Sequence, residues 1–145
     1  MKIIIQIIIV FVFLIIIFSV IYSVSRFDNS GLNFNKLKSS LSDIPIHDLL
    51  NFSGEGGVNG VSLRGRYKSY YFNGDKKDEI VNFYLENAKK NRWELKQKNL
   101  RSGSMIFCEN GIAYNFDFSV YEKLMIGVYW TSNRNSPNYC RESGH

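Results

Sequence analysis

Three cationic residues stand at every second position near the middle of the chain: Arg64, Arg66 and Lys68. Residues two apart in a β-strand share a face, so this spacing predicts a strand with the cations side by side. We call these three residues the cationic row. The commonest meaning of such a pattern is an ordinary solvated face. The alternative is a contact surface for an anionic partner, either an acidic protein surface or lipid headgroups.

The aromatic residues beside the cationic row suggest a nucleic-acid surface, but their spacing argues against one. A single-strand platform needs bases stacked on aromatic rings that share a face with the cations. Tyr67 and Tyr71 alternate onto the opposite face, and Tyr70 and Phe72 alone share the cationic side. The net charge of +5 is also modest for a nucleic-acid-binding protein. We therefore do not expect a nucleic-acid partner.

Residue types that support catalysis or metal binding are sparse. The chain has two histidines, His47 between apolar neighbours and His145 at the last position. Asp117 alternates with phenylalanines and so belongs to the polar face of a strand. No zinc or calcium spacing is present, and the glycine-rich stretch 53–60 lacks the phosphate-loop and dinucleotide motifs. We predict a flexible loop there, and a protein with no enzymatic activity, metal or cofactor.

The two cysteines, Cys108 and Cys140, leave two interpretations open. They form a disulfide if the domain is exported, or they are unrelated thiols, one in a strand and one in a tail. A disulfide would close a loop of about 33 residues and contribute roughly 3–4 kcal/mol by chain-entropy reasoning.

The segment 3–24 contains no charge and is almost wholly apolar. As a helix it would extend roughly 33 Å, close to the ~30 Å hydrocarbon core of a bilayer. The apolar run is longer than the 7–15 residues typical of a signal peptide, so we favour an uncleaved anchor over a cleaved signal. A buried core helix is excluded because the segment is apolar on every face. We therefore predict contact with membrane lipid through residues 3–24.

Charges flanking this segment do not by themselves decide its orientation. Lys2 precedes it, and Arg26, Lys36 and Lys38 follow it. Large domains cross membranes with little regard to their charge, and a Met-Lys-apolar start is typical of export. We expect a single-pass protein with the short N-terminal tail inside and the C-terminal domain outside.

The remainder divides into a polar linker at 25–35, a domain at 36–132 and a tail at 133–145 that we expect to be loose unless Cys140 holds it to the domain. Amphipathic spacing predicts a helix from Asp75, as N-cap, to a left-handed Asn91. Asn110-Gly111 between apolar runs predicts a hairpin. The order helix, strand, helix and three further strands predicts an α+β fold. In it, a helix packs on a four-stranded, largely antiparallel sheet.

The predicted helix and the strand after it carry a recognisable motif at Phe83, Tyr84, Ala88 and Trp93. It resembles the "FY…A…W" helix-to-strand motif of small membrane-anchored bacterial envelope and immunity-type domains. Here Asn91 and Arg92 stand where that motif has glycine. The resemblance implies a non-enzymatic protein-binding domain on the periplasmic side of the bacterial inner membrane, one version being an immunity protein against a delivered toxin. A structural subunit of an envelope or secretion assembly is the alternative.

Overall fold

The computed structural model describes residues 6, 11–19, 34–60, 62–99 and 103–141. The chain forms two compact units, Met1–Asn33 and Phe34–His145. In the first unit, residues 11–19 are helical and their large apolar side chains are exposed. No helix within the described ranges is long and apolar enough to span a membrane. Most of the predicted anchor, 3–24, and of the predicted linker, 25–35, lies outside those ranges.

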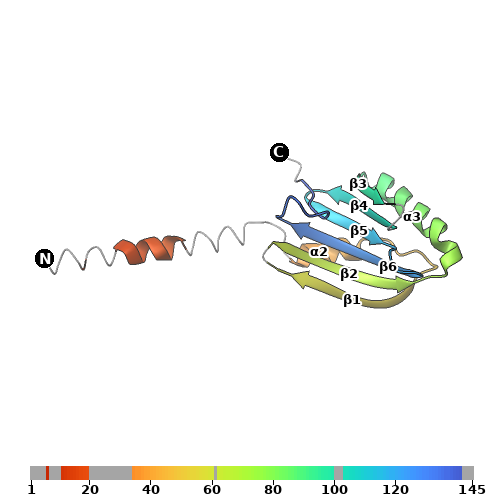
Figure 1. Cartoon of the computed structure of the whole chain (residues 1–145), viewed down its shortest axis with the longest axis horizontal. Helices are drawn as coiled ribbons and strands as arrows, with labels where there is room; N and C mark the ends of the chain where they lie inside the picture. The colour runs from red at the N-terminus through yellow and green to blue at the C-terminus, as the bar shows by residue number, and fades with distance from the viewer. Residues whose placement is uncertain (1–5, 7–10, 20–33, 61, 100–102, 142–145) are drawn as a thin grey trace. The chain divides into compact units, whose positions relative to one another are not determined.

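The second unit is built on a six-stranded antiparallel sheet in the order β1-β2-β6-β5-β4-β3 (Figure 1). The α+β class and the antiparallel sheet are confirmed, but the prediction of four strands was wrong. The extra strands include β1, which forms from the stretch that we predicted to be a glycine loop. The strands are β1 (Asn51–Asn59), β2 (Leu63–Tyr71), β3 (Glu94–Asn99), β4 (Ser104–Glu109), β5 (Ile112–Asp117) and β6 (Lys123–Thr131).

One face of this sheet carries the main core. Helix α2 (Phe34–Ser42) contacts β2 and β6, and helix α3 (Lys77–Lys90) places the Tyr84 ring 4.5 Å from the Phe116 ring of β5. Trp93, just after α3, stacks on Tyr114 at 4.1 Å. We call this side of the sheet the helical face. Its fully buried side chains include Leu37, Ile80, Tyr84, Phe116, Leu124, Ile126 and Val128.

Helix α3 forms where amphipathic spacing predicts it, with different ends. Ile80, Tyr84 and Ala88 are buried four residues apart, as one stripe on a helix. Asp75 does not cap the helix, because it lies inside a short 3₁₀ turn, η1 (Gly74–Lys76). The left-handed residue after the helix is Arg92, with φ 58°, rather than Asn91.

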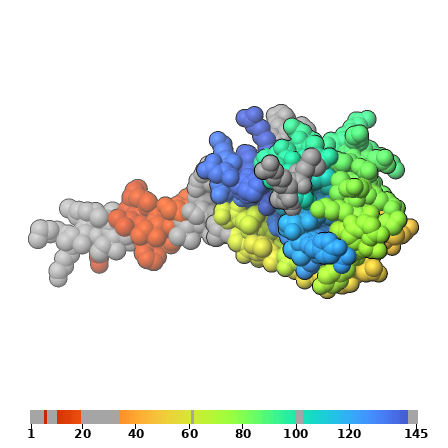
Figure 2. All heavy atoms as spheres, turned by 45° about the vertical axis from the view of Figure 1, so that its right-hand side comes forward, coloured from red at the N-terminus to blue at the C-terminus, as the bar shows by residue number. Residues whose placement is uncertain are grey.

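The start of this helical segment is held against the β5–β6 turn. The N–H of Gly74 donates to Glu122 Oε1 at 3.4 Å, and the N–H of Phe72 donates to the Glu122 carbonyl at 3.1 Å. Figure 2 shows the contact, with the green surface of η1 and α3 against the light-blue surface of the turn. The connection between β2 and α3 is therefore held against the turn that joins β5 to β6.

The opposite face of the sheet is covered in part by the C-terminal segment. Cys140 forms a disulfide with Cys108 of β4 and packs with Ile106, Ala113 and Tyr129. Lys96 Nζ of β3 also donates to the carbonyls of Pro137 and Tyr139. The tail predicted to be loose therefore lies against the sheet as far as it is described, because covalent and polar contacts hold it there. Residues 142–145 lie outside the described ranges.

Candidate binding surface

Strand β1 forms one edge of the sheet and is exposed along most of its length. Its sequence, NFSGEGGVN, is poor in residues that favour strands, because glycine loses much entropy on ordering and has no side chain to pack. For this reason the sequence indicated a loop. Its regular pairing with β2 from Gly54 to Asn59 must therefore be explained by contacts with its neighbour.

Two glycines of β1 make room for long side chains that cross from β2. A Cβ atom at Gly56 would lie 2.4 Å from the Tyr67 hydroxyl oxygen. A Cβ atom at Gly57 would lie 2.8 Å from the Gly65 carbonyl and 3.1 Å from Cδ of Arg66. Tyr67 thus lies over β1 on one face of the sheet, and Arg66 lies over it on the helical face. Both side chains extend from β2 toward the open edge.

Arg66 is held in this position by an aromatic ring. Its guanidinium carbon lies 4.1 Å from the centroid of the Phe34 ring at the start of α2. Such a cation–π contact contributes about 0.5–2 kcal/mol, depending on its exposure to water. Arg66 Nε is buried and has no hydrogen-bond partner among the described residues. The aromatic contact therefore holds the side chain in place, while its Nε makes no hydrogen bond to the described residues.

The structure places Arg64, Arg66 and Lys68 together on the helical face, each of them half-buried. The interpretation of an ordinary solvated face is therefore not what the structure shows. The physical reason is that the same alternation continues into Tyr70 and Phe72, which are 4% and 6% exposed. The cationic row lies at the margin of the helical face, on the strand between β1 and β6.

Positive charge is in excess at this margin. Glu55, the one charged residue of β1, stands opposite Lys68 in the β1–β2 register. Burial, and secondarily the Glu55 carboxylate, raises the pKa of the neighbouring Tyr70. Three cations against one carboxylate leave two positive charges, so the surface is suited to an anionic partner.

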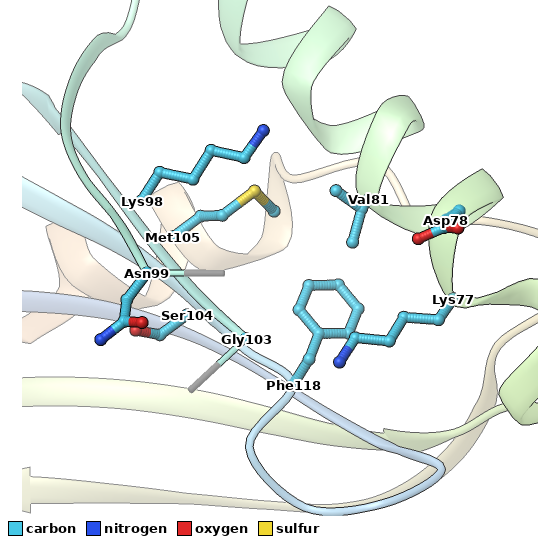
Figure 3. A pocket seen from close by; sticks show the side chains of 9 residues that line it. All are labelled: Lys77, Asp78, Val81, Lys98, Asn99, Gly103, Ser104, Met105 and Phe118. Carbon is cyan, nitrogen blue, oxygen red and sulfur yellow. The ribbon is translucent and has the colours of Figure 1, made fainter. Parts of the chain in front are cut away.

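A cleft of about 240 Å³ lies under the first turn of α3 (Figure 3). Lys77 of α3 and Lys98 of β3 reach it from different elements, with Phe118 between the strands and the helix. The remaining lining is Asp78, Val81, Asn99, Gly103, Ser104 and Met105. This mixture of apolar and charged groups suits a small amphipathic molecule but points to no particular reaction.

A second hollow of about 250 Å³ brings Asp43 and Glu109 together, a pair that sequence spacing did not indicate. The Tyr114 hydroxyl donates to Glu109 Oε2 at 3.0 Å. Burial, and then the bond to Glu109, raises the pKa of Tyr114 to about 12, so this phenol stays protonated at neutral pH. In this geometry the phenol donates a hydrogen bond to the Glu109 carboxylate.

His47 has a structural position. Its Nδ1 accepts the N–H of Leu49 at 3.2 Å, and its ring meets the edge of the Phe83 ring at 4.8 Å. The second histidine, His145, lies outside the described residues. His47 therefore has the geometry of a turn residue whose Nδ1 is hydrogen-bonded to the backbone, rather than that of a base beside a nucleophile.

A scan against protein-family models finds no match, and searches of curated proteins and of solved structures find none either. The resemblance of Phe83, Tyr84, Ala88 and Trp93 to envelope and immunity-type domains therefore stays a prediction.

Proposed function

We propose that this chain is a non-enzymatic protein-binding domain of the bacterial cell envelope, anchored in the inner membrane by residues 3–24. The observation that carries the proposal is the edge strand β1, over which Arg66 and Tyr67 extend from β2. Arginine and tyrosine are enriched among the residues that dominate protein interfaces. Arg66, held by Phe34, is ordered in advance, so binding costs less conformational entropy.

Two further observations support the envelope location. The disulfide Cys108–Cys140 is typical of proteins in oxidising compartments such as the periplasm. The apolar segment 3–24 has the length and composition of a membrane anchor. An immunity protein, which neutralises an incoming toxin, is one concrete version of such a domain.

The proposal is tested by site-specific photo-crosslinking of the full chain in bacterial membranes. A benzophenone amino acid replaces either Val58 on β1 or Leu95 on β3. The two form a matched pair because both lie on edge strands, with exposures of 41% and 48%. We expect a discrete protein adduct from position 58 and none from position 95. Equal labelling from both positions, or none from position 58, would contradict a binding surface at β1.

The cationic row is tested in the same assay by Arg64→Glu combined with Arg66→Glu. We expect the adduct from position 58 to be lost, because the surface then carries four fewer units of positive charge. An undiminished adduct would show that Arg64 and Arg66 of the cationic row do not contribute to partner binding. Alkaline phosphatase fused to the C-terminus tests the location, and an inactive fusion would contradict a periplasmic domain.

A further inference from the structure

We infer that the open edge of β1 binds its partner by strand addition, with an extended acidic segment pairing as a seventh strand of the sheet. This inference rests on the proposed function and adds the binding mode and the chemistry of the partner. In strand addition, main-chain hydrogen bonds supply affinity and side chains on alternate positions supply specificity.

The backbone of β1 presents hydrogen-bonding groups to this edge. The N–H of Gly60 donates to the Leu63 carbonyl at 2.8 Å, which identifies that pair as hydrogen-bonded. Hydrogen-bonded and non-hydrogen-bonded pairs alternate along an antiparallel ladder. With the register unbroken from Gly54 to Asn59, the N–H and C=O groups of Glu55, Gly57 and Asn59 point away from β2. An added strand would pair with these three residues.

The two edges of the sheet differ in how well they resist such pairing. Proteins protect edge strands with lysines, bulges and covering segments. β3 has all three: Lys96 and Lys98, an irregularity between Leu95 and Gln97, and the contact of Lys96 with the C-terminal segment. β1 carries Glu55 as its one charge and no proline or lysine, and its irregularity lies at its start, between Phe52 and Gly54. The stretch 54–59 is therefore the unprotected edge.

The chemistry of the added strand follows from Arg66 and Gly57. Neighbouring strands lie about 4.8 Å apart, so a seventh strand would run roughly 10 Å from β2. Its residue opposite Gly57 would have its side chain on the helical face, with no β1 side chain between it and Arg66. A Glu or Asp there would accept charge-assisted hydrogen bonds from the guanidinium, whose Nε has no partner among the described residues.

A second copy of this chain is a poorer occupant. Its β1 would bring Glu55 as the single carboxylate, followed by another cationic row on its β2. Like charges facing one another across a sheet are destabilising. The excess of positive charge therefore favours an acidic strand from a different protein.

The experiment uses the full chain in detergent micelles and rhodamine-labelled peptides followed by fluorescence anisotropy. The probes are an eight-residue Val-Glu alternating peptide and the same peptide with Lys for Glu. The third probe is the Val-Glu peptide N-methylated at the amides of its Glu residues, which would pair with β1. We expect the acidic peptide to bind about tenfold or more tightly than the lysine peptide, and N-methylation to weaken it by a similar factor.

Variants of the protein test the two parts of the inference separately. Arg66→Gln should lower the affinity for the acidic peptide by about tenfold. The same change at the exposed Arg134 serves as the control and should leave the affinity unchanged. Asn59→Pro should weaken binding because it removes one outward N–H and none that pairs with β2. Far-ultraviolet circular dichroism of each variant confirms that the sheet is retained.

The outcomes separate failure of this inference from failure of the proposed function. Equal binding of the acidic and lysine peptides would overturn the acidic chemistry of the added strand. Equal binding of the plain and N-methylated peptides would overturn strand addition, and the absence of binding at millimolar peptide would overturn both parts. A partner adduct from position 58 that persists in those cases would leave the protein-binding function standing. Loss of that adduct in Asn59→Pro and Arg66→Gln would support both.

Discussion

The Cys108–Cys140 disulfide allows a quantitative test of how the C-terminal half of the domain is stabilised. The bonded residues are 32 apart in sequence, so the bond closes a loop of about 33 residues that contains β5 and β6. Closing such a loop removes roughly 12.5 cal/mol/K from the entropy of the unfolded chain, or about 3.7 kcal/mol at 25 °C. We therefore expect Cys108→Ala combined with Cys140→Ala to lower the free energy of unfolding by about 3–4 kcal/mol.

The assay is urea denaturation of the full chain in detergent, followed by circular dichroism. Three samples are compared: the oxidised protein, the protein with reductant, and the double alanine variant. Reductant should destabilise the natural chain to nearly the level of the variant and leave the variant unchanged. A loss below about 1 kcal/mol in both comparisons would mean that the bond does not constrain the unfolded chain.

Two further predictions concern packing and pH. The Tyr129 ring lies over Gly65 and Gly127, where an added Cβ would fall 2.3 Å from ring carbons. Gly65→Ala or Gly127→Ala should therefore lower the free energy of unfolding by about 1–3 kcal/mol in the same urea assay. Gly54→Ala is the control because an added Cβ there meets no atom within 4 Å, and an equally large loss in this variant would contradict the prediction. The pKa of Tyr114 is raised to about 12 from 10.0, so its contribution to stability is complete below pH 10 and is lost as the pH rises toward 12. The fall in melting temperature between pH 10 and 12 should then be shallower in Tyr114→Phe than in the natural chain. A fall parallel to that of a Tyr121→Phe control would count against a protonated, buried Tyr114.

Local sequence signals predicted the elements that depend on neighbouring residues. The stripe of Ile80, Tyr84 and Ala88 marks α3 because side chains four apart share a helix face. Asn110 and Gly111 form the two-residue turn between β4 and β5, with φ of 47° and 79°, as a type I′ hairpin requires. Such signals operate over a few residues, so they can be recognised without knowing what packs against them.

The position of the cationic row illustrates what periodicity leaves undetermined. A period of two shows that Arg64, Arg66 and Lys68 share a face, but it does not show which face receives the helices. In the structure α2 contacts β2, and Phe34 covers Arg66, so the face that carries the charges is also the face that carries the core. The same pattern is compatible with a solvated face until the helix is placed.

The α+β class, the antiparallel sheet, helix α3 and the β4–β5 hairpin can therefore be predicted from the amino-acid sequence, since each is encoded by residues close in the chain. The formation of an edge strand by NFSGEGGVN depends on tertiary contacts, because Gly56 and Gly57 leave room for Tyr67 and Arg66 of the neighbouring strand. Tertiary structure also decided that the C-terminal segment lies against the sheet, since its disulfide joins residues 32 positions apart. Contacts of this kind have no local signature, because each partner's role exists only once the other is in place.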